Sequence, residues 1–546
     1  MKIIVYVSSY KNKVLHFFEK VFYENNRKLD LSGKDLDLVS IEESYMMQGK
    51  FWLLVDSNDN VHGTIAIRKI QDFFEIRRFF VDKANKHYKY GEKLLYTALD
   101  YAMANKIKVV KAATMKESNE ARHLFQKYGF KKCCRYNNSS ADLFFELLLN
   151  IQTEYQIRLD YLREKNNQSL ILNPTENLPF EVYNSVSSNF LEGLYISERH
   201  KDVNDKVIFG GRNEYIDFVG FIKNMWIQRL HATDVDLKPL SGLNAHLILF
   251  LCILKPDEKV MILPEICGGH FATQAILNHI GVQPFEMIAD YEKMCVDKKA
   301  TLKLIEKKCI DYVFVDRSEG LYYEDFSWLS DCNAYKIFDA SQYLTSILCE
   351  AYPNPFDWGF DMIVSTLHKN YPGPQKGMFA VKNTEDVVWD RYVKNAKTFI
   401  SNTHPKSIID SIRPQLNIEA LASYNERTTS CILGLEKSLY DNGVPVIRRS
   451  SSIIPTQHLW IQCPSPESNY EYYLNLENVG LLTNYRLLPY KIGFGLRIGL
   501  SAAVLTGLNE SHIEELSEIM STIYKDGLSD VTEKRTLEFI KRVKSH

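Results

Sequence analysis

Two charged residues close short apolar segments, where burying a charge is costly unless it is paired. Lys369 ends the segment 364–369, directly before a turn rich in glycine and proline. A lysine desolvated at such a place has a lowered pKa, and its neutral amine attacks carbonyl groups to form Schiff bases. Taken alone, Lys369 fits a surface lysine in a loop better than a cofactor lysine. Asp339 ends the apolar segment 337–339, upstream of the lysine.

Asp339 needs a cation as its partner, and the protonated pyridine nitrogen of pyridoxal 5'-phosphate is such a cation. The alternative is that Asp339 caps a following helix. If Asp339 pairs with the ring nitrogen, then the two reactive groups of the cofactor, the ring nitrogen and the carbonyl that forms the Schiff base with Lys369, both have a partner. We therefore predict a pyridoxal-phosphate site, to which Thr366 and His368, just before the lysine, also belong.

Three further motifs suit the same cofactor and an amino-acid substrate. Ser241, Gly242 and Leu243 precede an apolar helix, whose positive end can bind a phosphate. The turn 268–270 presents the imidazole of His270, which can stack on a ring. Arg497 stands in the strand-like segment 495–499 and can grip an α-carboxylate with two hydrogen bonds. The structural alternatives are a helix cap, a core histidine and a buried ion pair.

A second phosphate motif lies near the N-terminus. The strand-like segment 75–81, a turn ending at Gly91 and an apolar helix form a unit whose backbone amides could hold a pyrophosphate. Any loop before a helix can look the same. Glu75 on this strand could act as a general base, directly or through water, or it could be a solvated surface residue.

The patterns predict two α/β regions that position these residues. The first has an antiparallel meander at 51–55, 62–70 and 73–81, then a helix at 92–105, a strand at 108–114 and a helix at 119–128. From residue 175, helical patterns alternate with short β-branched strands. This alternation predicts a mostly parallel sheet covered by helices. Its strands are expected at 260–263, 312–315, 336–338 and 362–364.

Composition favours small-molecule chemistry. The 546 residues include 66 Lys and Arg against 68 Asp and Glu, so no net field attracts nucleic acid or an anionic membrane. The longest apolar run, Leu247 to Leu254, is too short to span a bilayer, and residues 1–7 do not resemble a signal peptide. We expect a cytoplasmic protein. The ten cysteines lack C-x-x-C spacing, so we expect no metal site.

Most of residues 1–135 resembles the GNAT family of acetyltransferases, through the unit ending at Gly91, the sequence 119–121 and the closing 127–130. The resemblance implies acetyl-CoA, admitted between two splayed parallel strands. The implied cofactor-binding residues are Val81, Lys86, Gly91 and Asn119. Residues 86–91 keep only the last glycine of the family's Arg/Gln-x-x-Gly-x-Gly/Ala motif. Phe125 stands where many members have the tyrosine that acts as general acid.

Residues 170–525 are similar to serine hydroxymethyltransferase. The similarity rests on an ordered set of motifs: Thr175-Glu176-Asn177, Phe209-Gly210-Gly211, Ser241-Gly242, Gly268-Gly269-His270, Ser318, Asp339, His368-Lys369 and Gly495-Leu496-Arg497-Ile498-Gly499. It implies the aminotransferase fold, fold type I, normally a homodimer. By this resemblance Lys369 holds the cofactor, Asp339 the ring nitrogen and Arg497 the substrate carboxylate. His270 stacks on the ring, Ser241 and Gly242 bind the phosphate, and Thr175 lies near the substrate.

The departures from this family concern its folate chemistry. Gln342 replaces the histidine that ends the family's Asp-x-x-His motif. The family's Tyr-Ala-Glu-Gly supplies the acid that works between the substrate hydroxyl and folate. Here the segment reads Tyr195 to Glu198, so Glu198 is the candidate acid, one residue out of register, and Tyr195 is a candidate substrate contact. The glycine-rich segment that reaches the partner's phosphate is absent at 400–405. Tetrahydrofolate is therefore the weakest inherited feature.

We expect a GNAT-like domain at 1–150, a linker at 151–170, a pyridoxal-phosphate domain at 171–395 and a small α+β subdomain at 396–546. The predicted activity makes or breaks a Cα–Cβ bond on a glycine-, serine- or threonine-type amino acid, beside an N-acetyltransferase. A folate-independent aldolase or transaldolase stays open. So does an N-terminal domain that only binds CoA or docks a partner.

Overall fold

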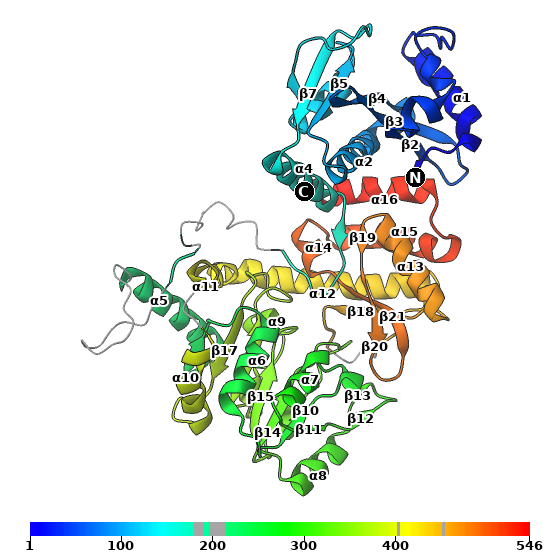
Figure 1. Cartoon of the computed structure of the whole chain (residues 1–546). Coiled ribbons are helices and arrows are strands. Elements are labelled where there is room, and N and C mark those ends of the chain that lie inside the picture. The colour runs from blue at the N-terminus through cyan, green and yellow to red at the C-terminus, as the bar shows by residue number, and fades with distance from the viewer. Residues whose placement is uncertain (179–190, 192, 196–212, 401–403, 450–453, 546) are drawn as a thin grey trace. The chain divides into compact units, whose positions relative to one another are not determined.

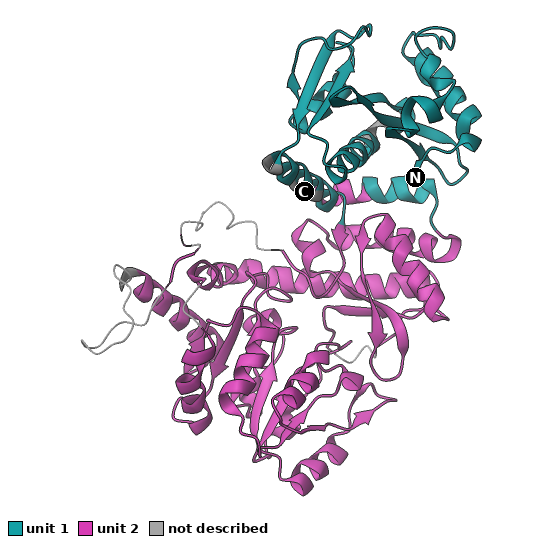
Figure 2. Cartoon of the chain, in the orientation of Figure 1, with its two compact units in different colours: residues 1–169, 528–538 teal, residues 170–527, 539–546 magenta. Residues whose placement is uncertain are grey.

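The computed structural model describes residues 1–178, 191, 193–195, 213–400, 404–449 and 454–545. They form two compact units (Figure 2). Unit 1 contains residues 1–169 and 528–538, and unit 2 contains residues 170–527 and 539–546.

These units divide the chain differently from the domains expected from the sequence. Residues 151–170 contain the helix α4 (Ile151–Asn167), which belongs to unit 1. Residues 528–538 also belong to unit 1, where the Tyr90 hydroxyl donates to the Glu533 carboxylate at 2.8 Å. No local pattern predicts a contact between residues so far apart in the chain. The finer boundaries inside unit 2 remain a proposal.

Unit 1 is built on a mixed seven-stranded sheet, as the sequence predicted (Figure 1). The strand order is β1-β2-β3-β4-β5-β7-β6, and all neighbours are antiparallel except β4 and β5. The strands are β1 (Lys2–Val5), β2 (Gly49–Val55), β3 (Val61–Ile70), β4 (Phe73–Val81), β5 (Val109–Thr114), β6 (Lys131–Lys132) and β7 (Leu143–Leu148). The predicted meander is thus confirmed as β2, β3 and β4.

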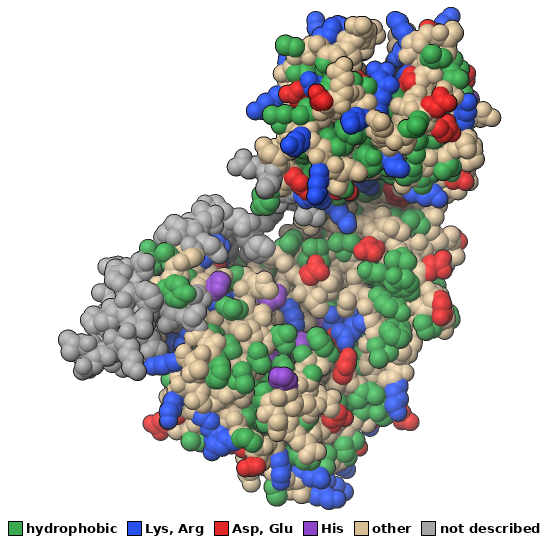
Figure 3. All heavy atoms as spheres, viewed as in Figure 1, with side chains coloured by type: hydrophobic (Ala, Val, Ile, Leu, Met, Phe, Trp, Pro, Cys, Tyr) green, Lys and Arg blue, Asp and Glu red, His purple; other side chains and the backbone are tan. Residues whose placement is uncertain are grey.

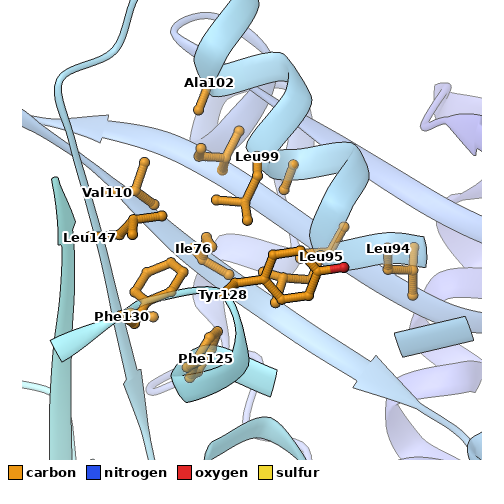
Figure 4. Packing of buried hydrophobic residues seen from close by; sticks show 14 of the residues in the cluster. Ile76, Leu94, Leu95, Leu99, Ala102, Val110, Phe125, Tyr128, Phe130 and Leu147 are labelled. Carbon is orange, nitrogen blue, oxygen red and sulfur yellow. The ribbon is translucent and has the colours of Figure 1, made fainter. Parts of the chain in front are cut away.

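The helix α2 (Tyr90–Ala104) packs a row of apolar side chains onto the sheet of unit 1. The unit also contains α1 (Lys11–Glu24), α3 (Asn119–Lys127) and α4. Figure 4 shows Leu95 and Leu99 of α2 against the strand residues Ile76, Val110 and Leu147, all of them buried. The apolar side chains of α2 recur at helical spacing, so one face of the helix is buried on the sheet.

Unit 2 contains a second seven-stranded sheet, in the order β11-β10-β14-β15-β16-β17-β9. The first five strands run parallel. β17 pairs antiparallel with both β16 and β9, so β9 runs in the same direction as the first five and β17 is the one reversed strand of this sheet. The strands are β9 (Asp234–Asp236), β10 (Val260–Ile262), β11 (Pro284–Glu286), β14 (Tyr312–Val315), β15 (Tyr335–Asp339), β16 (Met362–Thr366) and β17 (Gly377–Val381). The four strands predicted from β-branched runs are all present, and the mostly parallel sheet is confirmed.

Helices cover this sheet (Figure 1), and on one face aromatic side chains pack against it. The helices α6 (Gly242–Ile253) and α10 (Val387–Phe399) share one apolar core with the sheet. On the other face, Phe338 of β15 lies within ring contact of Tyr343, Tyr352 and Phe360. Burial on both faces explains why the strands are almost wholly apolar.

The C-terminal part of unit 2 adds a small sheet, β18-β21-β20. Its strands are β18 (His458–Ile461), β20 (Asn484–Leu488) and β21 (Gly493–Gly499), and short pairs form between β8 (Leu170–Ile171) and β19 (Leu481–Leu482) and between β12 (Ala289–Asp290) and β13 (Cys295–Val296). The remaining helices are α5 (Asn213–Leu230), α7 (Phe271–His279), α8 (Lys298–Lys308), α9 (Leu344–Leu348), α11 (Pro405–Asp410), α12 (Ile418–Asp441), α13 (Pro466–Asn478), α14 (Ser501–Leu505), α15 (Ile513–Asp526) and α16 (Asp530–Val543). None of the described helices has the length and apolar character that a bilayer-spanning segment needs.

Candidate active site

Lys369 lies just beyond the carboxyl end of β16, at the sheet edge where ligands of parallel α/β sheets bind. The side-chain amide of Asn177 donates to the Lys369 carbonyl at 2.6 Å and fixes the backbone there. Burial lowers the pKa of the Lys369 amine below the usual lysine value; the charge of Asp339 opposes this shift, and that of Arg497 adds to it. The neutral amine that Schiff-base formation needs is therefore favoured.

Asp339 is the last residue of the neighbouring strand β15 and is buried. Its carboxylate accepts hydrogen bonds from His246 Nε2 at 2.7 Å and from the Ser341 amide at 2.7 Å. Burial alone would raise the pKa of Asp339, but the hydrogen bond and charge of His246, with the charge of Lys369, lower it to about 2. Asp339 is thus an ionised carboxylate that can hold a protonated ring nitrogen.

The N-terminus of α6 lies against the end of β16. Ser241 caps this helix, with its hydroxyl accepting from the Asn244 amide at 3.2 Å. A Cβ atom on Gly242 would come within 3.3 Å of Thr366 Cβ, so glycine allows this close approach. Thr366 Oγ1 lies 2.7 Å from His368 Nδ1. Leu243 follows in the first turn of the helix and is exposed. Because Gly242 approaches Thr366 closely, the positive end of the helix, capped by Ser241, faces the strand that leads to Lys369.

His270 is the N-cap of α7 and is partly buried. Its Nδ1 accepts from the Ala272 amide at 3.3 Å. Burial, followed by the charges of His246 and Lys369, lowers the pKa of His270 to about 3. Its ring lies 5.6 Å from that of His246, which itself bonds Asp339. A neutral imidazole, which can stack on an aromatic ring, is therefore held next to His246, the hydrogen-bond partner of Asp339.

Gly268 makes this turn possible. Its φ is +87°, and a Cβ atom there would lie 2.0 Å from the Glu319 carbonyl oxygen. We expect Gly268→Ala to lower the free energy of unfolding by about 3 kcal/mol or more, since backbone strain and a clash add up. Gly281, with φ +80° and no atom within 4 Å of its Cβ position, is the matched control and should cost only about 1 kcal/mol as alanine. Chemical denaturation of both variants measures the difference; equal losses would contradict the clash.

Arg497 lies in the middle of β21 and is only 2% exposed. Its Nη1 forms an ion pair with Glu319 and a 3.4 Å hydrogen bond to the Ser318 carbonyl. Its Nε has no hydrogen-bond partner within the described part of the chain. A buried donor without a partner is costly, so this edge of the guanidinium is suited to a carboxylate ligand. Ser318 takes part through its backbone.

The side chains of Thr175 and Gln342 form hydrogen bonds with residues outside the predicted site. The Thr175 hydroxyl donates to Asn173 at 2.8 Å, in a segment that packs on β21 through Pro174 and Gly499. Gln342 is buried, and its amide oxygen meets the side chains of Gln457 and His458. Tyr195 is 45% exposed. Glu198 and the motif 209–211 fall outside the described residues.

In unit 1, Glu75 is 1% exposed, so the interpretation as a solvated residue is wrong. Its carboxylate accepts from Arg68 at 3.2 Å and from Asn137 at 2.6 Å. Each carboxylate oxygen of Glu75 thus has a partner. Such pairing is needed because an unpaired charge buried on a central strand would be costly. Its role as a base remains a proposal.

Three of the four expected CoA residues of unit 1 lie between the end of β4 and the first turn of α2. Val81 ends β4, Lys86 lies in a short 3-10 helix (Lys83–Tyr88), and Gly91 opens α2. Lys89 has φ +62°, the left-handed conformation that the family's first glycine would adopt easily. Asn119 begins α3, is exposed and accepts from Arg122.

Three residues of unit 2 were missed by the sequence reasoning. His246 contacts Asp339 and Glu319 contacts Arg497, both predicted site residues, and Arg486 pairs with Glu319. His246 is a lone imidazole in an otherwise apolar helix, which was a usable signal. Glu319 and Arg486 meet across many intervening residues, so only the structure shows their pairing.

The fold and the site define a class. The sheet has six strands in one direction and one reversed strand, β17, and a lysine beyond β16 faces an aspartate at the end of β15. These features are those of a pyridoxal-phosphate enzyme of fold type I. Figure 3 shows histidine and Lys or Arg side chains near one another on the visible face of unit 2.

Residues 19–130 match the acetyltransferase (GNAT) family and residues 160–416 match the serine hydroxymethyltransferase family. The chain is thus a fusion of a GNAT-like domain with a serine hydroxymethyltransferase-like domain. Its curated relatives include the serine hydroxymethyltransferase of Metallosphaera sedula, 24% identical over 71% of this chain and 92% of the relative. That of Pyrobaculum calidifontis is 24% identical over 57% and 75%. A solved L-threonine transaldolase from Pseudomonas fluorescens shares the fold, with a TM-score of 0.63, 20% identity and coverage of 72% and 93%.

Proposed function

We propose that unit 2 binds pyridoxal phosphate at Lys369 and makes or breaks the Cα–Cβ bond of a glycine-, serine- or threonine-type amino acid. The observation that carries this proposal is the convergence of Lys369, the ionised Asp339 and the α6 N-terminus at one edge of the sheet. The similarity to serine hydroxymethyltransferases and to a threonine transaldolase supports the same reaction class.

The residues present fit this cofactor. Lys369 would hold its carbonyl carbon, Asp339 its ring nitrogen, His270 its ring face, and Ser241 with Gly242 its phosphate. When bound, pyridoxal phosphate withdraws electrons from the substrate Cα. An ionised Asp339 keeps the ring nitrogen protonated, and the His246 hydrogen bond keeps Asp339 in place.

Arg497 would orient the amino acid. Its free Nε edge can receive one α-carboxylate while Nη1 stays on Glu319. With the carboxylate held on Arg497 and the amine in the place of the Lys369 amine, rotation about the N–Cα bond is restricted. One of the two other substituents of Cα can then be set along the direction of bond cleavage. Positioning of this kind lowers the barrier without any new functional group.

Product analysis tests the proposal. The purified chain, loaded with pyridoxal phosphate, is incubated with glycine and a panel of aldehydes, and with serine or threonine, each with and without tetrahydrofolate. We expect a β-hydroxy amino acid or the released aldehyde. Serine cleavage that requires tetrahydrofolate would identify a hydroxymethyltransferase. The absence of any product in all reactions would contradict the function.

For unit 1 we propose acetyl-CoA binding between β4 and β5. The two strands pair only at Phe74–Ile76 and Val110–Ala112, and β4 continues to Val81 without β5. The Glu92 carboxylate near the start of α2 is neutralised by an ion pair with Lys127, so it does not repel a pyrophosphate. The residues that hold the cofactor fit, whereas the position of the expected acid is taken by the buried Phe125.

Because Phe125 cannot protonate a leaving thiolate, we expect acetyl transfer by the wild type to be slow although CoA binds. Phe125→Tyr should raise the transfer rate by about 10²-fold, a typical gain from a general acid, with the CoA affinity unchanged. Calorimetric titration with CoA and a thiol-release assay with amino acids measure the two quantities. Failure of CoA to bind the wild-type chain would refute the proposal for unit 1.

We also propose a cytoplasmic homodimer, as the resemblance of unit 2 implies. Analytical ultracentrifugation of the cofactor-loaded chain checks the dimer. A monomer that retains full activity would contradict it.

A further inference from the structure

Glu319 is a buried carboxylate shared by two arginines, and no motif assigned it a role. It is 2% exposed, and its Oε1 forms ion pairs with Nη1 of Arg497 and Nη1 of Arg486. Its backbone amide donates to the Gly268 carbonyl at 2.9 Å, so it is fixed to the turn before His270. Its Oε2 is buried and makes no hydrogen bond to any described residue. Glu319 therefore belongs to the wall of the site, beside the arginine expected to hold the substrate.

The charges around Glu319 leave a place for one anion. Two buried or partly buried guanidinium groups and the buried Glu319 carboxylate give the cluster a net charge of about +1. Arg486 Nη2 also lies 3.8 Å from Glu265, but this carboxylate is exposed, so water screens its charge from the cluster. Arg497 keeps a free Nε donor in a buried setting. One substrate carboxylate on Arg497 therefore neutralises the cluster.

A second carboxylate would enter an unfavourable field. It would approach the unpaired Oε2 of Glu319 in a buried region, where like charges repel strongly because water screens them little. Arg486 cannot compensate while Glu319 holds it. Neutral groups meet no such barrier.

We infer that Glu319 is a specificity-determining charge filter, which restricts unit 2 to amino acids with a single carboxylate and to aldehydes without an acidic group. The inference rests on the proposed function of unit 2. We expect serine- and threonine-like substrates to bind, and aspartate-like substrates or carboxylated aldehydes to be excluded.

The test compares serine with aspartate on the cofactor-loaded full chain. Binding is followed by the change in the visible absorbance of the cofactor. We expect the wild type to bind serine at least about 100-fold more tightly than aspartate, as a like-charge contact across a binding site predicts. In Glu319→Gln, which keeps the shape and frees Arg486, this ratio should fall by about 10-fold or more. Glu265→Gln, at an exposed residue, is the matched control and should leave the ratio unchanged.

A second variant covers the case in which Glu319→Gln does not fold. Arg486→Gln removes one counter-charge from Glu319 and should increase the preference for serine over aspartate. An unchanged ratio in either folded variant, with both affinities reduced alike, would mean that Glu319 is only structural and would overturn the inference. A wild type whose absorbance responds to no amino acid would overturn the proposed function as well, so the two failures are distinguishable.

Discussion

Lys369→Ala is expected to remove the visible absorbance of the bound cofactor and to lower the rate of Cα–Cβ cleavage by about 10³-fold or more, equivalent to about 4 kcal/mol. The reason is that Lys369 is the only predicted site lysine whose amine lies at the carboxyl end of the sheet beside Asp339. Its lowered pKa favours the amine form that bonds the cofactor. Absorbance spectra and steady-state kinetics measure both effects.

Lys376 provides the matched control for this variant. It is also buried, and burial lowers the pKa of its amine to about 8, yet its Nζ donates to the Lys238 carbonyl at 3.2 Å. Lys376→Met should keep the absorbance band. If the band survives in Lys369→Ala, or disappears in Lys376→Met alone, the assignment of the cofactor lysine is wrong.

Arg497→Gln is expected to lower kcat/KM by about 10²- to 10³-fold, mainly through KM, because breaking a buried hydrogen-bonded charge pair costs about 2–5 kcal/mol. Arg497→Lys should recover little, since an ammonium group lacks the planar fork that grips a carboxylate. Burial lowers the pKa of Arg497, but the ion pair with Glu319 opposes the shift, and the guanidinium stays charged.

The control for the arginine variants is Arg449, which is also buried and binds Glu436 through Nε at 2.7 Å. Arg449→Gln should destabilise the fold without a selective rise in KM. A wild-type KM in Arg497→Gln would contradict the carboxylate role. Denaturation curves for both variants separate loss of stability from loss of binding.

Much of the fold could be predicted because the signals were local. The strands β10, β14, β15 and β16 were visible as β-branched runs, since strands buried on both faces are almost wholly apolar. Lys369 and Asp339 could be predicted because each charge closes an apolar run. The N-cap Ser241 was visible as a serine before an apolar helix.

The remaining features depend on contacts between distant parts of the chain. Glu319 meets Arg486 of β20 and Arg497 of β21, two paired strands that lie far from it along the chain. Residues 528–538 join unit 1 through contacts such as that of Glu533 with Tyr90. Periodicity and turn chemistry describe neighbours in sequence and carry no information on such pairs.

The most direct test of the pyridoxal-phosphate site is chemical trapping. Borohydride reduction of the cofactor-loaded chain, followed by digestion and peptide mass spectrometry, locates the lysine bonded to the cofactor. The account predicts a pyridoxyl group on the peptide that contains Lys369, in near-stoichiometric amount. Modification of another lysine, or none at all, would contradict it.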